Sequence, residues 1–294
     1  MAATILRVPE LPDLAVLADA FDAILAGRRL TAVRVADALV LRATPGQAAG
    51  LVGETVEGVE RRGKHLVFRL TAHDLWAAPM LSGRFGLAAP GAPKPKAAIT
   101  LVVGSRPAPR RPAAAWMAGA RWMPADDREL EMRYLDPTRM GKLYVAPAGD
   151  ARGVPGMADL GPDADDPALT LEVWQARIKR HPGELKPLLR NQAFVAGLGN
   201  AYSDEVLWEA RLSPFRRRAS LAPEETAALY AATRTTLAAS VELLQRRVPP
   251  TFEKQVRDHL HVHLRGGLPC PRCGATISQV GGREATSYCR SCQR

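Results

Sequence analysis

The stretch Cys270-Pro271-Arg272-Cys273, followed after fifteen residues by Cys289-Arg290-Ser291-Cys292, contains all four cysteines of this 294-residue chain. Two C-x2-C pairs at this separation are typical of a tetrahedral thiolate site for structural zinc. Four soft thiolates close the coordination shell and leave no position for water. The pattern predicts one structural Zn²⁺ per chain, bound by Cys270, Cys273, Cys289 and Cys292, with a hairpin between the two pairs.

Two disulfides or free thiols are the alternatives for these cysteines. Disulfides need an oxidising compartment, and acidic residues from Glu10 to Asp22 interrupt any secretory signal in the first thirty residues. No stretch approaches the roughly 18 apolar residues of a membrane span. We therefore expect a cytosolic protein of bacterial type that has no membrane partner.

Positive charge gathers in the same part of the chain. The sequence has 40 Lys and Arg against 30 Asp and Glu, a formal net charge of +10. Residues 177–294 hold 19 of these basic and 10 of these acidic residues, a balance of +9. Such an excess attracts phosphates, which makes nucleic acid the first partner to consider. Taken singly, a run such as Arg216-Arg217-Arg218 can also be a solvated helix end.

Helical segments are expected before the cysteine module, near residues 170–180, 184–191, 200–210, 223–245 and 251–259. Between the second and third of these segments, the sequence Phe194–Tyr202 places Gly197 and Gly199 directly before a helix, with Asn200 near its start. Exposed backbone N–H groups at a positive helix end can bind a phosphate. A tight connection between two helices would explain the same pattern.

The N-terminal part has a different pattern. Leu14, Leu17, Phe21 and Ile24 lie at helical spacing and predict an amphipathic helix that ends at Gly27. From Leu30 to about Val145, short alternating runs bounded by turn residues predict a β-sandwich or barrel, with strands at 31–35, 56–59, 65–70, 98–103 and 142–145. The fold class is therefore α+β and multidomain.

Changes in composition suggest the domain boundaries. We expect a β-sandwich domain over residues 9–150, a linker rich in Gly, Pro and Asp over 151–169, a helical domain over 170–262 and the cysteine module over 263–294.

Several motifs, taken in chain order, resemble one family. Pro9–Asp13 resembles the N-terminal signature of the formamidopyrimidine-DNA glycosylase/endonuclease VIII family, and Arg62-Gly63-Lys64 resembles its lysine hairpin. Leu185-Lys186-Pro187 and Gly197–Tyr202 resemble its helix–two-turn–helix element, and the cysteine module resembles its zinc finger. The resemblance spans about residues 8–294. It implies a catalytic β-sandwich and a helical, zinc-bearing domain that grip DNA across a cleft.

The resemblance implies a base-excision-repair enzyme, a bifunctional DNA glycosylase and abasic-site lyase. Its partner would be double-stranded DNA with damaged bases or abasic sites, and the damaged base would be flipped out. The nucleophile would be the amine of an N-terminal proline, here Pro9, which forms an iminium with the sugar. Glu10 would be the neighbouring acid and base, and Lys64 would hold a phosphate and support catalysis.

The resemblance also implies a set of DNA contacts. Met80 would fill the gap left by the extruded base, and Arg139 would also contact DNA. Lys186, Asn200 and Arg283 would bind the phosphates that flank the lesion. We expect the protein to be a monomer.

The sequence departs from the family pattern at the nucleophile. Eight residues precede Pro9, and an internal proline nitrogen is an amide without a nucleophilic lone pair. We expect translation to begin at Val8, because GTG reads as valine internally but as methionine at a start, and removal of that methionine would free Pro9. Without a free amine, the alternative is a non-catalytic relative that binds damaged DNA.

Further departures concern the DNA contacts. Thr138–Gly141 stands where the formamidopyrimidine branch tends to have Arg-Arg-Phe-Gly, so Met140 replaces the intercalating aromatic residue. Glu284 falls at the position of the family's finger arginine, one residue after Arg283. The segment Val248–Leu264 is short for the loop that covers an oxidised purine. Oxidised purines and oxidised pyrimidines both stay open as lesions.

Overall fold

The computed structural model describes residues 8–93, 96–106, 113–123, 128–282 and 284–294. The chain forms two compact units. The described residues up to Pro9, from Asp13 to Ala158 and from Leu244 to Gln255 form the first unit. Glu10–Pro12, Asp159–Leu243 and Val256–Arg294 form the second unit.

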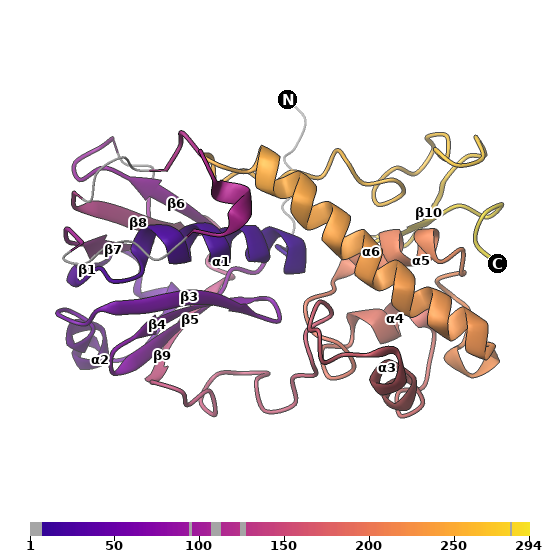
Figure 1. The fold of residues 1–294 in the computed structure, drawn as a ribbon, viewed down its shortest axis with the longest axis horizontal. Coiled ribbons are helices and arrows are strands. Elements are labelled where there is room, and N and C mark those ends of the chain that lie inside the picture. The colour runs from indigo at the N-terminus through magenta and orange to yellow at the C-terminus, as the bar shows by residue number, and fades with distance from the viewer. Residues whose placement is uncertain (1–7, 94–95, 107–112, 124–127, 283) are drawn as a thin grey trace. The chain divides into compact units, whose positions relative to one another are not determined.

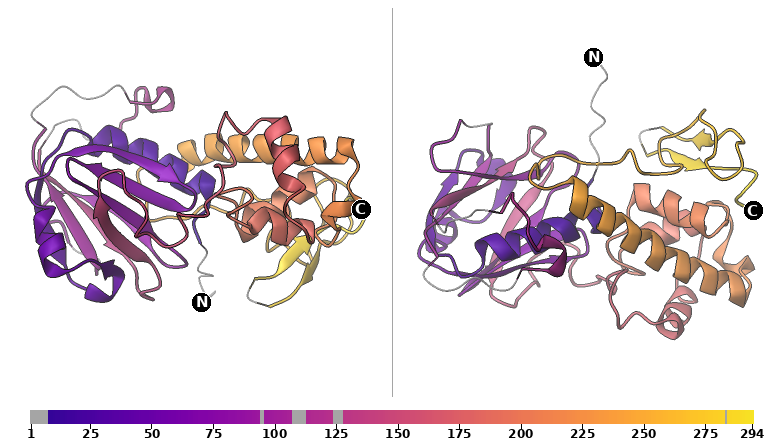
Figure 2. Two further views of the ribbon diagram at one scale, coloured as in Figure 1. Left: turned by 90° about the horizontal axis from the view of Figure 1, so that it is seen from below. Right: turned by 45° about the horizontal axis from the view of Figure 1, so that its top comes forward.

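The first unit contains two β-sheets, which confirms the expected β-sandwich (Figure 1). One sheet has the antiparallel order β1-β7-β8-β6, and the other has the order β2-β9-β5-β4-β3, in which β2 and β9 are parallel. Two further views show the same strands (Figure 2). The strands are β1 (Leu30–Val35), β2 (Leu41–Arg42), β3 (Val56–Arg62), β4 (His65–Leu70), β5 (His73–Ala78), β6 (Arg84–Ala88), β7 (Ile99–Val103), β8 (Leu130–Leu135) and β9 (Lys142–Pro147).

The expected N-terminal helix is α1 (Leu11–Leu25), and its apolar side is buried. The ring of Phe21 lies 6.4 Å from Phe68 of β4 and 6.1 Å from Phe85 of β6, so α1 contacts both sheets. After α1 the chain turns at Gly27, whose φ is +81°. The first unit also contains α2 (Pro45–Gly50) and the short 3-10 helices Ala38–Val40 and Ala115–Met117.

The second unit is helical. It contains α3 (Leu171–Ile178), α4 (Leu185–Arg190), α5 (Asn200–Glu209), the 3-10 helix Arg218–Ser220 and α6 (Pro223–Arg247), whose last residues belong to the first unit. Trp174, Phe194 and Tyr202 lie in its buried core.

The helix expected over residues 251–259 is wrong. After Pro249-Pro250 the chain forms single turns, such as Lys254 N–H to Thr251 O, and no helical ladder follows. Proline has no backbone N–H to continue the α6 hydrogen bonds.

The cysteine module lies at the end of the second unit, drawn in yellow in Figure 2. Its strands β10 (Ser278–Val280) and β11 (Thr286–Tyr288) pair antiparallel. Trp208 and Val262 share a small core with Cys270, Ile277 and Cys289. Among the described residues, no helix combines the length and hydropathy needed to cross a bilayer.

Candidate active site

Glu10 lies directly before α1 in the chain, but its carboxylate binds the N-terminus of α5. Oε2 accepts hydrogen bonds from the backbone amides of Gly199 (2.6 Å) and Tyr202 (3.1 Å), and Oε1 accepts one from Ala201 (2.8 Å). The residue is only 2% exposed. The first amides of a helix lack partners within it and carry positive partial charge, so a carboxylate there is stabilised and held in one position.

The two glycines before α5 make this approach possible. A Cβ on Gly199 would lie 2.5 Å from Cδ of Glu10, and a Cβ on Gly197, where φ is +98°, would lie 2.8 Å from Leu11 Cδ1. The amide of Leu11 also donates to the carbonyl of Gly197 at 3.0 Å. The sequence analysis considered the N-terminus of α5 as a site for a phosphate. In the structure the carboxylate of Glu10 occupies that helix end.

Pro9 and Lys64 belong to the first unit. Pro9 is buried and lines a small pocket with Asp13, Leu17 and Arg84. Lys64 lies in the two-residue turn between β3 and β4, next to Gly63, whose φ is +55°. The turn confirms the expected hairpin, and the side chain of Lys64 is partly buried.

Met80 and Arg139 lie in two turns, and the buried carboxylate of Asp136 makes hydrogen bonds to both turns. Asp136 accepts hydrogen bonds from Ser82 in the turn after β5 and from the Gly141 amide, at 2.6 Å, in the turn before β9. Met80 and Arg139 both have positive φ, 50° and 57°. Met80 is 42% exposed.

Arg139 is not free in this structure. Its guanidinium donates to Asp37 and holds the pKa of that carboxyl below its ordinary value. A DNA contact from Arg139 therefore requires exchange of this partner. The neighbouring Met140 is 43% exposed.

Lys186 and Asn200 lie together at the cysteine hairpin. The Nζ of Lys186 and the Nδ2 of Asn200 both donate to the carbonyl of Ala285, at 3.2 and 3.3 Å. Lys186 is 4% exposed, and burial holds its pKa below the ordinary value although Asp204 Oδ1 lies 2.7 Å away. The Lys186 amine thus supports the hairpin in this structure.

Asp204 is a site residue that the sequence analysis missed. Besides Lys186, it accepts from His263 Nδ1 (2.8 Å) and from the Ser287 amide (3.3 Å). Its neighbour Glu205 accepts from the backbone amides of 261–263. The available signal was the pair of adjacent acids directly before the apolar residues Val206-Leu207-Trp208 of α5, because buried acids need dedicated partners.

The hairpin between the cysteine pairs carries an ion pair. Glu284 Oε2 lies 2.6 Å from Arg190 Nη2, at the end of α4. Glu284 stands where the family's finger arginine was expected, and its charge is opposite. Arg283 lies outside the described residues.

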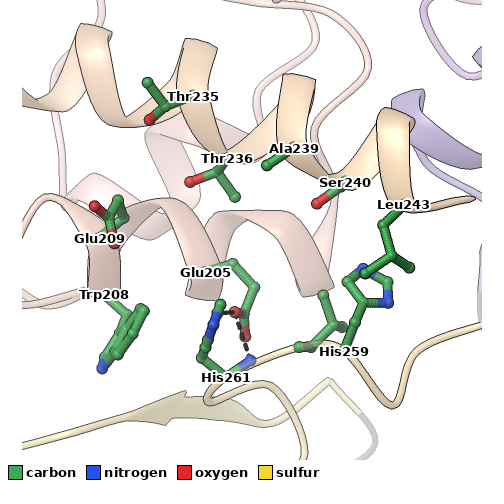
Figure 3. Close-up of a pocket in the computed structure, with 11 residues that line it drawn as sticks. Glu205, Trp208, Glu209, Thr235, Thr236, Ala239, Ser240, Leu243, His259 and His261 are labelled. Atoms are coloured by element: carbon green, nitrogen blue, oxygen red, sulfur yellow. Dashed lines mark hydrogen bonds and ion pairs between the residues drawn. The ribbon is translucent and has the colours of Figure 1, made fainter. Parts of the chain in front are cut away.

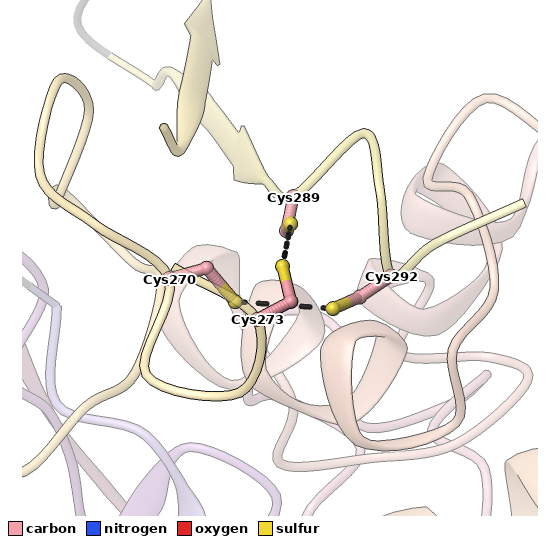
Figure 4. A group of neighbouring side chains, drawn as sticks. All are labelled: Cys270, Cys273, Cys289 and Cys292. Atoms are coloured by element: carbon pink, nitrogen blue, oxygen red, sulfur yellow. Dashed lines mark hydrogen bonds between the residues drawn. The ribbon is translucent and has the colours of Figure 1, made fainter. Parts of the chain in front are cut away.

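The four cysteines form one cluster (Figure 4). All are free thiols, so the disulfide alternative is absent, and their sulfurs lie within 4.8 Å of one another. Cys270 and Cys292 are 3.9 Å apart, and Cys273 and Cys289 are 3.5 Å apart. The cluster can hold one metal ion.

Two family models match the chain. The formamidopyrimidine-DNA glycosylase N-terminal domain matches residues 8–143, and the formamidopyrimidine-DNA glycosylase H2TH domain matches residues 160–249. The two matches fall on the β-sandwich and on the helices of the second unit. They define the class as a DNA glycosylase with a helix–two-turn–helix domain.

Individual relatives agree along nearly the whole chain. The formamidopyrimidine-DNA glycosylase of Symbiobacterium thermophilum is 32% identical over 97% of this chain and 89% of its own. The crystal structure of the MutM (Fpg) protein from Thermus thermophilus is also 32% identical, with a TM-score of 0.77 over 97% of this chain and 98% of that one. The Lactococcus lactis glycosylase bound to abasic-site DNA, 23% identical over 97% of this chain and 99% of its own, shares the fold with a TM-score of 0.78.

This chain belongs to the formamidopyrimidine-DNA glycosylase family. It is accordingly a glycosylase of base-excision repair.

Proposed function

We propose that this glycosylase excises a damaged base from duplex DNA and then cleaves the strand at the abasic site, with the amine of Pro9 as nucleophile. The observation that carries the proposal is the position of Glu10. Three backbone amides of α5 hold its carboxylate, and the nitrogen of Pro9 lies one residue before it in the chain. The chain itself therefore joins the proposed nucleophile to the residue whose carboxylate is held.

The chemistry follows from these two groups. The Pro9 nitrogen attacks C1′, the bond from C1′ to the base breaks, and the base leaves with the electron pair. Glu10 takes up the proton that the Pro9 nitrogen loses and delivers it to O4′ as the ring opens, which leaves a C1′ iminium on Pro9. The positive iminium acidifies the C2′ proton, and its removal expels the 3′ phosphate. An α-amine suits the first step because it titrates near 7.7–8.0, against about 10.4 for lysine.

The DNA contacts belong to the same proposal. Lys64 binds a phosphate beside the flipped nucleotide, and Met80 and Arg139 contact the duplex from their turns. Asn200, Lys186 and Arg283 act at the flanking phosphates, and Lys186 also supports the hairpin through its hydrogen bond to the Ala285 carbonyl. The family relationship and the +9 charge balance of residues 177–294 support DNA as the partner.

We further propose that the active chain begins at Pro9. The match to the N-terminal family model begins at Val8, which supports an initiator at that position. Mass spectrometry of the protein expressed from its own gene tests this proposal. An N-terminal peptide that starts at Pro9 is expected, and a Met1 peptide alone would contradict it.

The metal of the cysteine cluster is proposed to be zinc. Zinc–sulfur bonds of about 2.3 Å in a tetrahedron place neighbouring sulfurs about 3.8 Å apart. The Cys270–Cys292 and Cys273–Cys289 separations of 3.9 and 3.5 Å fit that size. Bound zinc would close the module through its four thiolates, and the hairpin residues would then be held against Lys186 and Asn200.

Borohydride trapping on abasic-site duplex DNA tests the function. Chains that begin at Met1 and at Pro9 are compared, and a covalent adduct is expected only from the chain that begins at Pro9. Fluorescence anisotropy with the same DNA is run as a control for binding.

A second candidate is a damaged-DNA-binding relative without catalysis. This function would follow if the nitrogen of Pro9 stays in a peptide bond, because an amide nitrogen is not a nucleophile. Tight binding by both chains without an adduct from either would favour that function.

A further inference from the structure

Trp208, near the end of α5, contacts a cysteine of the cluster through its polar atom. Its indole Nε1–H donates to Sγ of Cys270 at 3.4 Å, and the residue is only 7% exposed. An N–H donor that points at a sulfur in a buried setting stabilises negative charge on that sulfur. Four thiolates around a divalent ion carry a net charge of −2, so a donor of this kind matters most when the metal is bound.

The indole ring is held on both faces. The ring of His261 stacks on it with centroids 4.4 Å apart and planes 14° apart, and the guanidinium carbon of Arg272 lies 3.8 Å from its centroid. Two flat groups this near to one centroid would collide on the same face, so they occupy opposite faces. Figure 3 shows His261 beside Trp208.

Each of these two neighbours is itself fixed. Glu205 Oε2 accepts from the backbone N–H of His261 at 2.7 Å and lies 3.1 Å from its Nδ1. Arg272 donates to the carbonyl of Trp208 at 2.7 Å and to Glu209 at 3.0 Å. The direction of the indole N–H is therefore set by groups on α5, on the 261 segment and between Cys270 and Cys273.

We propose that Trp208 is a positioning residue of the metal site, which strengthens metal retention through its hydrogen bond to Cys270. This inference rests on the proposed zinc site. Trp208 would stabilise the thiolate of Cys270 as a metal ligand. It lies on α5, the helix whose first amides hold Glu10.

Trp174 provides a matched control. It is fully buried in the same unit and lies 4.8 Å from the ring of Phe194. Its Nε1 has no hydrogen-bond partner within the part of the chain that the structure describes. Trp174→Phe therefore removes another buried indole of the same size, without loss of a hydrogen bond to a sulfur.

The experiment measures zinc release from the full chain. Purified protein is first assayed for metal, with one zinc per chain expected, and is then mixed with the chromogenic chelator 4-(2-pyridylazo)resorcinol. Loss of a hydrogen-bond partner of a metal ligand typically lowers metal affinity by about 10- to 100-fold. Release from Trp208→Phe is expected to be faster by about that factor, and release from Trp174→Phe should stay within about twofold of wild type.

A spectroscopic measurement separates the hydrogen bond from packing. In the Co²⁺-loaded chain, removal of the donor raises the energy of the sulfur lone pairs. The thiolate-to-cobalt band of Trp208→Phe should move to longer wavelength, while that of Trp174→Phe should not. Where Trp208→Phe does not fold, benzothienylalanine at position 208 keeps the bicyclic shape and lacks the N–H.

The outcomes are distinct. Wild-type release kinetics together with an unshifted band in a folded variant would overturn the role of Trp208 and leave the zinc site intact. Wild-type protein that binds neither Zn²⁺ nor Co²⁺ would contradict the zinc site itself, and the inference with it.

Discussion

The Glu10 carboxylate accepts a hydrogen bond from the backbone amide of Gly199 at 2.6 Å, although 189 positions of sequence separate the two residues. This bond and its two companions bring the residue after Pro9 to the first turn of α5. The helix–two-turn–helix element thus has a second role besides any contact with DNA. It fixes the position of the candidate acid.

Glu10→Gln, in the chain that begins at Pro9, should lower base release by about 100-fold or more, because the general acid is lost. DNA binding should change by less than about threefold, since the substitution leaves the phosphate contacts in place. Single-turnover kinetics and anisotropy measure the two effects. Glu57→Gln, at an exposed site on β3, is the control.

The same substitution should also reduce stability. Both oxygens of Glu10 accept N–H donors, so the new amide NH₂ must face one of them, at a cost of about 1–3 kcal/mol. Thermal melts establish whether the variant is folded at the assay temperature. Unchanged excision by a folded Glu10→Gln variant would remove this residue from its proposed role.

Asp204→Asn should destabilise the second unit strongly. Asp204 is fully buried and balances Lys186, which is 4% exposed. Removal of one partner leaves a buried charge uncompensated, which costs about 3–5 kcal/mol. Urea unfolding measures the loss, and the double variant with Lys186→Met should recover part of it. A loss below about 1 kcal/mol would contradict the importance of the pair.

His65 should make the protein less stable in mild acid. Burial lowers its pKa to about 4 in the folded chain, against about 6.5 when unfolded. The unfolded chain therefore binds more protons between these values, so the free energy of unfolding falls as the pH drops from 6.5 towards 4. Above pH 6.5 this contribution is fully present.

The corresponding test is denaturant unfolding at pH 7 and pH 5. His65→Leu should lose about 1–2 kcal/mol less than wild type between these two conditions. An equal loss in both proteins would show that His65 does not titrate as the structure implies.

Glu284→Ala should strengthen DNA binding. The substitution removes a negative charge from the hairpin and releases Arg190, now 2.6 Å away. We expect about fivefold tighter binding at low salt, with the difference shrinking as salt rises. Titrations at two salt concentrations measure it, with Glu224→Ala as the control. No change at low salt would indicate that this face of the hairpin lies away from the DNA.

Local sequence patterns predicted much of the fold. The apolar spacing of Leu14, Leu17, Phe21 and Ile24 predicted α1, and the alternation in 65–70 predicted β4. Strands β5, β6 and β8 were missed for physical reasons. In β5, residues 74–77 are buried continuously, so apolar and polar residues do not alternate. In β8, the charged residues Arg133 and Glu131 are buried as an ion pair of 2.7 Å. In β6, Gly86 interrupts the run of strand-forming residues, because the side chain of Glu253 occupies the space that a Cβ at position 86 would need.

The candidate site was predictable only where one motif contains it. The cysteine cluster follows from the spacing of Cys270, Cys273, Cys289 and Cys292, and its four sulfurs do come together. The partners of Glu10, Lys186 and Asp204 come from distant segments, so no local pattern could predict them.

Peptide mapping of the borohydride-trapped adduct tests the central claim most directly. The chain that begins at Pro9 is reacted with abasic-site DNA, reduced and digested, and the modified residue is located by tandem mass spectrometry. The account predicts one modified peptide with the reduced sugar on the Pro9 nitrogen. A modification on Lys64 or another lysine amine would contradict Pro9 as the nucleophile, and so would the absence of any adduct from DNA-bound protein.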